Sequence, residues 1–195
     1  MIRLPEPPRL TRPAVAVRTS YLVGEQADCV VGGAPADWLG PASEDFASYV
    51  AERRAVRTRW GVPSSEFWYV SGEYYLGTLV IRQRLTPELA EAGGHVGYHV
   101  VVPWRRQGHA TRMLAAGLVG CRRLGLSEVL LTCDPGNEPS RRVIPPTAGC
   151  RAAGRGARTG SGSASPDHPA SRPARGQLRP IPPPPPRRPI RQRGP

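Results

Sequence analysis

The chain has 195 residues, which is room for one ordinary domain, and its formal net charge of +12 is unevenly spread. Residues 1–144 hold 17 arginines against 14 acids, whereas residues 145–195 hold 10 arginines, one acid and 13 of the 24 prolines. Because the excess charge lies in the last quarter, it does not argue that the folded part binds nucleic acid. No segment approaches the roughly 20 apolar residues of a membrane span, and the N-terminus lacks a signal-peptide core, so we expect a cytoplasmic protein.

The first half of the chain predicts one helix and three strands after an irregular N-terminus at residues 1–14. Phe46, Tyr49 and Val50 recur at helical spacing in "ASEDFASYVAERRA", where Ser43 can cap the helix. Two apolar runs on either side of Gly72 predict a hairpin, and a third run follows a short connection. The expected elements are a helix at 42–55, strands at 62–72 and 73–85, a connection at 86–94 and a strand at 95–103.

The next segment predicts a helix between two strands. Leu114, Leu118 and Cys121 lie at i, i+4 and i+7, which gives residues 111–126 one apolar face before Gly125 ends the helix. "SEVLLTCD" (127–134) predicts a buried strand, so that strand, helix and strand imply a parallel pair with a right-handed crossover. "PGNEPSRRVI" (135–144) opens a further helix.

The cysteines favour a reducing compartment. Cys29, Cys121, Cys133 and Cys150 form no C-x-x-C pair and have no histidine at metal-binding spacing. We therefore expect core thiols and predict no metal site.

The turn between the third strand and the long helix carries the chemistry. A loop that enters a helix N-terminus collects backbone N–H groups that the helix cannot satisfy, which suits an anion such as a pyrophosphate. Gly108 removes a side chain where phosphate would approach the backbone, and Ala110 keeps the helix start narrow. Arg105 and Arg106 add positive charge at the rim. The turn matches neither of the common glycine-rich phosphate loops.

The order Arg105-x-x-Gly108-x-Ala110, after "HVVVP" and before an amphipathic helix, resembles the acyl-CoA loop of the GNAT N-acetyltransferase family. The hairpin, the "GHVGYHVVVP" strand, the helix, the "VLLTCD" strand and "NEPSRRVI" also follow in the family's order. The resemblance covers about residues 15–144. It implies an α/β fold with a mixed central sheet of the GNAT type, lacking its last strands and followed by a disordered tail. Acetyl-CoA would be the donor substrate and an amine of unknown identity the acceptor, and homodimerisation is left open.

The resemblance also implies where the cofactor lies. Pantetheine would bond to the strand backbone, the pyrophosphate would bind amides of the loop, and the Val101 N–H would serve as the oxyanion donor. Asn137 matches a position that often contacts the cofactor in the family. The residues implied to bind the cofactor are Val100, Val101, Val102, Arg105, Arg106, Gln107, Gly108, His109, Ala110, Thr111 and Asn137.

The proton-transfer groups are less well defined. His99 on the strand or Glu73 in the hairpin turn could be the general base, although a histidine in a strand is more often a packed residue. The family's usual acid is a tyrosine on the helix after the fifth strand, and this chain has no tyrosine beyond Tyr98. Trp104 could flank the cofactor or pack at the surface.

The sequence leaves the family pattern after Ile144. We therefore divide the chain into an irregular N-terminus (1–14), an acetyltransferase domain (15–144) and a disordered tail (145–195), and we expect Pro145 and Pro146 to end the last helix.

Two explanations of residues 145–195 remain open. A changed reading frame fits, because codons exist for residues 145–150 that read Ala-Asn-Gly-Gly-Val when shifted by two nucleotides, which is the family's turn. Such a change would impair the enzyme. Alternatively, the tail is genuine and the protein is a non-catalytic basic adaptor that binds nucleic acid.

Overall fold

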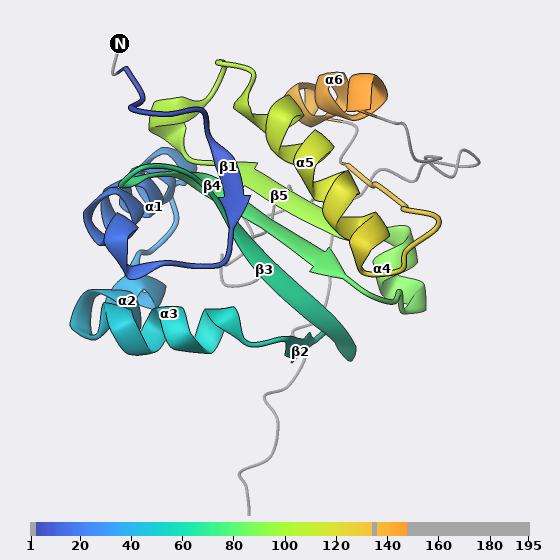
Figure 1. Ribbon diagram of the computed structural model, residues 1–195, viewed down its shortest axis with the longest axis horizontal. Helices are drawn as coiled ribbons and strands as arrows, with labels where there is room; N and C mark the ends of the chain where they lie inside the picture. Colours follow the sequence, from blue (N-terminus) through green and yellow to red (C-terminus); the bar gives the residue numbers. More distant parts are fainter. Residues whose placement is uncertain (1–2, 134–135, 148–195) are drawn as a thin grey trace, which may run out of the picture.

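A computed structural model describes residues 3–133 and 136–147, which form an open five-stranded sheet with helices on both faces (Figure 1). This arrangement confirms the predicted α/β class. The strands are β1 (Arg9–Thr11), β2 (Arg57–Arg59), β3 (Val62–Ser71), β4 (Tyr74–Arg82) and β5 (Val96–Val100). The α-helices are α1 (Arg18–Gly32), α2 (Gly40–Glu44), α3 (Phe46–Arg54), α4 (Pro87–Glu91), α5 (His109–Arg123) and α6 (Glu138–Thr147), with short 3-10 turns η1 (Val15–Val17), η2 (Asp37–Leu39) and η3 (Val102–Trp104).

The sheet has the order β1-β3-β4-β5, with β2 also paired to β3, and every described pair is antiparallel. The predicted hairpin is confirmed: Ser71 pairs with Tyr74 across a turn in which Gly72 has a φ of 56°. Strand β5 pairs with β4 through Thr78 and His99, which leaves its other edge toward α5 and α6. The element order from the hairpin to α5 is therefore as expected.

Helix α1 was not predicted, and its polarity explains why. Its buried positions include Tyr21, Glu25, Asp28 and Cys29, which lie at helical spacing, but two of these four are acids. Its exposed positions include three valines, Val23, Val30 and Val31. Hydrophobic periodicity detects a helix that buries its apolar stripe, so it misses one that buries carboxylates.

The region predicted as one helix at 42–55 contains two helices. Asp45 has φ −135° and ψ 87°, so it interrupts the helix between α2 and α3. Its carboxylate accepts a hydrogen bond from the Ser48 N–H at 3.0 Å. The cap of the longer helix is therefore Asp45 and not Ser43.

The last helix is longer than expected. We predicted that Pro145 and Pro146 would end it, but α6 continues to Thr147. Proline has a helical φ, so it can occupy the last turn although it cannot donate a hydrogen bond. The predicted boundary at residue 144 therefore falls inside α6, and the rest of the predicted tail (148–195) lies outside the described residues.

The segment predicted as a buried strand at 127–134 is not a regular strand in its described part. Val129 is buried, and the His95 N–H donates to the Leu130 carbonyl oxygen at 2.8 Å. The Leu130 N–H, however, donates to His95 Nδ1 at 2.9 Å, so a side chain occupies a donor that a ladder would use. The expected parallel pair with β5 is absent from the described part of the chain.

The two faces of the sheet carry different helices (Figure 1). On one face, α5 packs closely because Gly117 and Gly120 lie against Leu79 and Ile81. On the other face, Tyr21 of α1 stacks on Trp68 with ring centroids 4.7 Å apart, and α2 and α3 complete the aromatic core. Cys121 of α5 is buried in the hydrophobic core, as predicted. None of the described helices has the length and apolar character needed to cross a membrane.

Candidate active site

The loop between β5 and α5 has the backbone geometry of an anion site. Arg106 and Gly108 have φ values of 62° and 74°, which turn the chain sharply before α5 begins at His109. No side chain in the described part of the chain caps this helix, and its first turn contains no acid. Among the described residues, the N–H groups of the first turn therefore have no side-chain partner, and they form the positive end of the helix dipole.

Arg112, which was not predicted as a site residue, reinforces this loop. Its guanidinium donates to the Gln107 carbonyl oxygen at 2.9 Å and lies 3.2 Å from His109 Nδ1. A Cβ at Gly108 would lie 3.2 Å from Arg112 Nη1, so a larger side chain there meets both a positive φ and this guanidinium. Burial and then Arg112 lower the pKa of His109 below 6.5, which favours a neutral ring.

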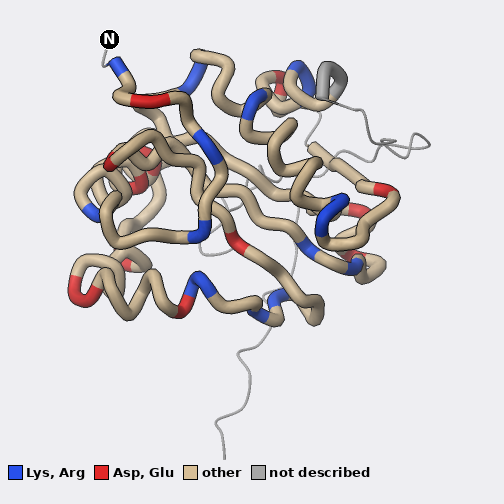
Figure 2. The backbone as a smooth tube through the Cα atoms, viewed as in Figure 1, with Lys and Arg blue, Asp and Glu red and all other residues tan. Residues whose placement is uncertain are grey.

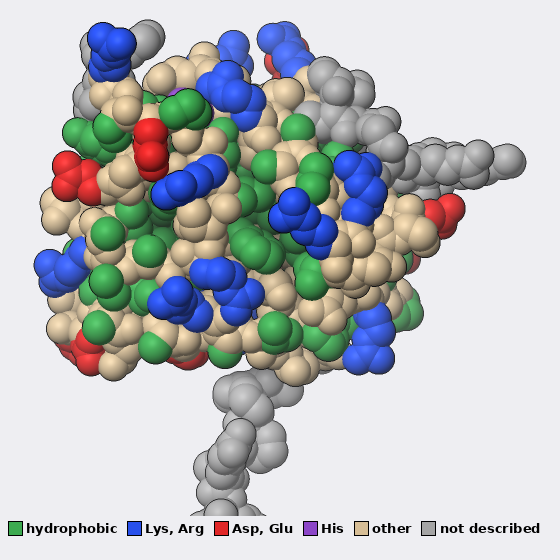
Figure 3. Space-filling model, viewed as in Figure 1, with side chains coloured by type: hydrophobic (Ala, Val, Ile, Leu, Met, Phe, Trp, Pro, Cys, Tyr) green, Lys and Arg blue, Asp and Glu red, His purple; other side chains and the backbone are tan. Residues whose placement is uncertain are grey.

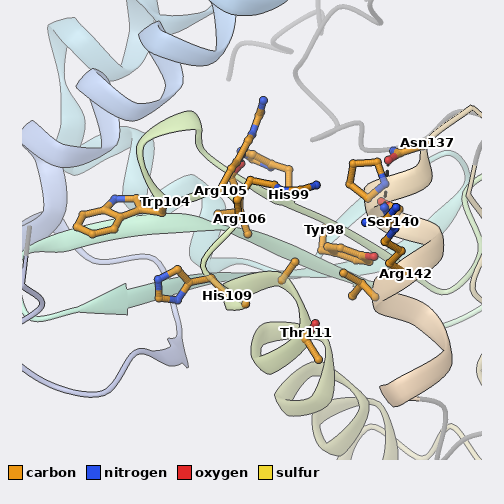
Figure 4. A pocket seen from close by; sticks show the side chains of 15 residues that line it. Tyr98, His99, Trp104, Arg105, Arg106, His109, Thr111, Asn137, Ser140 and Arg142 are labelled. Atoms are coloured by element: carbon orange, nitrogen blue, oxygen red, sulfur yellow. Dashed lines mark hydrogen bonds between the residues drawn. The ribbon is translucent and has the colours of Figure 1, made fainter. Parts of the chain in front are cut away.

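A cavity of about 550 Å³ opens between β5, this loop and α6 (Figure 4). It brings together most of the predicted site residues, whereas Gln107, Val102 and Val101 do not line it. The predicted residues that line it are His99, Val100, Arg105, Arg106, Gly108, His109, Ala110, Thr111 and Asn137, together with the aromatic residue Trp104.

The backbone of Val101 does not serve the predicted role. Its N–H donates to the Leu76 carbonyl oxygen at 3.0 Å, and its side chain is fully buried. The antiparallel ladder directs this N–H toward β4 and away from the cavity. The assignment of Val101 as the oxyanion donor is therefore wrong.

Arg105 is fixed in place and is not a loose charge at the rim. Its Nε donates to the Val100 carbonyl oxygen at 2.8 Å, and its Nη2 lies 2.6 Å from Asp28 Oδ2. Asp28 also accepts a hydrogen bond from the Val102 N–H at 2.6 Å. This carboxylate of α1 therefore contacts Val102 at the start of η3 and Arg105 just after its end. Burial raises the pKa of Asp28 above 3.8, although Arg105 and the Val102 N–H oppose the rise.

The imidazole of His99 pairs with a buried carboxylate. Its Nε2 is 3.0 Å from Glu25 Oε1, which also accepts the Tyr75 hydroxyl at 2.5 Å. The Tyr75 hydroxyl lies 2.6 Å from the Thr78 hydroxyl. Burial opposes a charge on His99, but Glu25 outweighs it, so the pKa of His99 is raised above 6.5.

Glu73, the other candidate base, is exposed in the hairpin turn and is not among the residues that line the cavity. Glu25 and Asp28 were not predicted as site residues, because no helix was predicted at residues 18–32. A helical wheel of that segment would have placed both acids on the face of Tyr21 and Cys29.

The far wall of the cavity is the start of α6. Asn137 caps that helix by accepting the Ser140 N–H at 3.1 Å, while Pro139, Ser140, Arg142 and Val143 line the space. Tyr98 reaches toward this wall from β5 (Figure 4). Burial raises the pKa of its hydroxyl, so Tyr98 keeps its proton at neutral pH.

Comparisons with known proteins found a structural likeness but no match to a family model or to a curated protein. Among solved structures, the chain is similar to a "putative ribosomal-protein-serine acetyltransferase" from Vibrio cholerae. That similarity has 18% sequence identity and a TM-score of 0.45, and it covers 72% of this chain and 78% of the other.

Proposed function

We propose that this protein is an acyl-CoA-dependent N-acyltransferase that moves an acetyl group from acetyl-CoA to an amine. The observation that carries the proposal is the uncapped start of α5 beside the cavity that β5 lines. A diphosphate needs several converging N–H donors, and an extended pantetheine arm needs a strand edge with open backbone groups. The cavity offers both.

The diphosphate would bind the first-turn N–H groups of α5 at His109, Ala110 and Thr111. The left-handed backbone at Arg106 and Gly108 aims the loop toward the same point, and Arg112 adds charge beneath it. The acids of the site, Glu25 and Asp28, lie on α1 and not in this loop.

The pantetheine arm would follow the outer edge of β5. His95 and Val101 hydrogen-bond to β4, so the alternate residues Tyr98 and Val100 direct their backbone groups outward. Arg105 already bonds the Val100 carbonyl oxygen, which leaves the Val100 N–H as the donor for the thioester oxygen. The role first given to Val101 therefore moves one residue along the strand.

In the reaction, the amine nitrogen attacks the thioester carbon, the C–S bond breaks and the CoA thiolate leaves. His99 accepts the amine proton, with Glu25 stabilising the resulting imidazolium. Tyr98, the residue before His99, lies on the opposite face of β5 from His99 and supplies a proton to the thiolate. Neither step needs a metal ion or a further cofactor.

Amine-dependent release of free CoA thiol from acetyl-CoA tests the proposal, with panels of small primary amines and of peptide N-termini. We expect release with at least one amine, and at least a tenfold loss of kcat in His99→Gln with acetyl-CoA binding retained. His95→Gln is the matched control, because His95 lies on the same face of the strand but outside the cavity. Equal kcat values for His99→Gln and wild type would remove His99 from the mechanism.

A further inference from the structure

A row of four hydrogen-bonded side chains links β4, α1 and β5. The Tyr75 hydroxyl of β4 donates to Glu25 Oε1 of α1 at 2.5 Å, and the same oxygen lies 3.0 Å from His99 Nε2 of β5. The Thr78 hydroxyl is 2.6 Å from the Tyr75 hydroxyl. All four residues are buried, and of the four it is His99 that lines the cavity. The row therefore connects the wall of the cavity to groups that the cavity does not reach.

An irregularity in β4 brings Tyr75 into this row. In a regular strand, Tyr75 and Thr78 would point to opposite faces, because they are three residues apart. The register of β4 against β3 shifts by one residue just after Tyr75, so both hydroxyls reach the same side. That side is the face that Thr78 shares with His99, its direct partner in β5. The strand is therefore bent at the place where it supplies a donor to Glu25.

The chemistry of these groups fixes the direction of each hydrogen bond. An ionised carboxylate only accepts, so Tyr75 and His99 both donate to Glu25. Tyr75 has one hydroxyl proton, so Thr78 donates to the Tyr75 oxygen, which strengthens the donation from Tyr75 to Glu25. In the neutral ring of His99 the hydrogen is therefore on Nε2, and Nδ1 is the nitrogen that accepts a proton.

The other charged and titratable groups around this row have partners of their own. Figure 2 shows the acidic positions on α1 and the basic ones at the end of α3. The hydrogen-bonded pairs are Tyr21 with Tyr49 at 2.6 Å, Arg53 with Glu66 at 3.0 Å, and Asp28 with Arg105 at 2.6 Å. Burial raises the pKa of Tyr75 well above its usual range, so its hydroxyl remains a donor while His99 titrates.

We propose that Tyr75, supported by Thr78, is a positioning residue for His99: its hydroxyl stabilises the Glu25 carboxylate, which holds the ring with its hydrogen on Nε2. Without this hydroxyl, the neutral ring would face a buried carboxylate that has lost a donor, which is costly. A proton on the pair relieves that cost, so His99 and Glu25 would keep the proton to higher pH. The catalytic part of this role rests on the acyl transfer proposed above, whereas the hydrogen bonds do not.

NMR of the histidine rings in full-length protein, recorded over a pH titration, tests this role without any activity measurement. The chain has four histidines, so the His99 signals are identified by their loss in His99→Gln. Tyr75→Phe should raise the midpoint of the His99 titration by about one pH unit, the size expected for one hydrogen bond to a charged group. Thr78→Val should raise it by less. Tyr69→Phe is the matched control and should leave the midpoint unchanged, because the ring of this buried tyrosine packs against His109.

The pH profile of kcat separates positioning from a merely structural role. In Tyr75→Phe its inflection should move to higher pH with the KM for acetyl-CoA unchanged, and an unmoved inflection would overturn the catalytic part of the role. An unchanged or lower His99 midpoint in Tyr75→Phe, or a wild-type ring with its hydrogen on Nδ1, would overturn the proposal. If Tyr75→Phe does not fold, the direction of the shift in Thr78→Val decides in the same way. The expected NMR shifts without thiol release by any amine would contradict acyl transfer and leave Tyr75 as the residue that positions the pair.

Discussion

At the scale of single residues, the carboxylate of Asp28 has the clearest structural role in the site. It connects α1 to the turn by accepting from the Val102 N–H and pairing with Arg105, whose Nε also bonds the Val100 carbonyl oxygen. Arg105 therefore orients the strand edge on which the proposed chemistry depends.

We expect Arg105→Ala to lower the free energy of unfolding by about 1 kcal/mol, because it breaks charge-assisted bonds of a half-exposed side chain. The loss should persist in high salt, since Asp28 is largely buried. Urea unfolding at low and high salt measures both effects. Arg106→Ala is the control, as Arg106 is exposed in the same turn. Equal stabilities of the two variants would show that Arg105 is not a structural residue.

The pair of His99 and Glu25 predicts a pH profile. Glu25 raises the pKa of His99, and only the neutral imidazole accepts a proton, so kcat should rise as the pH increases through a value above 6.5. Glu25→Gln removes the negative charge, so the inflection should move to lower pH. The pH dependence of kcat for both proteins measures this shift. An unmoved inflection would mean that another group titrates.

Only part of the site could be predicted from residues. The loop from Arg105 to Thr111 was identifiable, because glycine and alanine at fixed spacing report backbone requirements. Glu25 and Asp28 contact residues far along the chain, and the Arg112 side chain bends back onto the loop before its own helix. Local spacing in the sequence reveals neither kind of contact. The Val101 N–H was predicted to face the cofactor but donates to Leu76, because strand register decides which N–H faces outward.

At the scale of elements, the position of α1 depends on Gly24. A Cβ there would lie 2.9 Å from Val101 Cγ2, so the glycine lets α1 approach the turn closely enough for Glu25 and Asp28 to reach their partners. The helix itself carries little apolar signal, and its position is set by buried carboxylates and this close contact.

Gly24→Ala should destabilise the protein by about 1 kcal/mol or more, because a methyl group overpacks a fully buried contact. Gly32→Ala is the matched control, since that glycine ends the same helix and a Cβ there would meet nothing within 4 Å. It should be neutral, or stabilise by up to about 0.5 kcal/mol. Thermal melting compares the two, and equal melting temperatures would contradict the close-contact account.

Strands and helices differed in how well they could be predicted. The β3–β4 hairpin and α5 have strong periodicity and were anticipated with nearly their observed bounds. The segment at 127–134 is equally apolar but lacks a regular ladder, because pairing depends on a neighbouring edge and the His95 side chain occupies a ladder donor. Apolar runs therefore predicted burial, as at Val129, better than they predicted pairing.

At the scale of the whole molecule, basic charge is scattered on the face shown in Figure 3 and concentrated in residues 145–195. On the face shown in Figure 3, basic side chains are scattered among apolar and acidic ones and do not gather into one continuous patch. The concentrated charge belongs to residues 145–195, which hold 10 arginines and one acid. The adaptor alternative therefore depends on a segment that lies almost entirely outside the described residues.

A chain that ends at Thr147 should melt within about 2 °C of the full-length protein, because residues 148–195 offer no apolar periodicity with which to dock. Limited proteolysis should likewise leave a protected fragment that ends near residues 145–155. A large drop in melting temperature would show that the tail belongs to the fold. Salt-dependent nucleic-acid binding that disappears with the tail would favour the adaptor.

Calorimetry on two glycine variants tests whether the turn before α5 binds the diphosphate of acetyl-CoA, as we propose. Gly108→Val and Gly125→Val place the same branched side chain at similar φ values, 74° and 83°, but only Gly108 lines the cavity. We predict that wild type and Gly125→Val bind acetyl-CoA alike, whereas Gly108→Val binds at least tenfold more weakly, a loss of about 1.4 kcal/mol. Equal affinities of Gly108→Val and Gly125→Val, or no binding by wild type, would contradict the account.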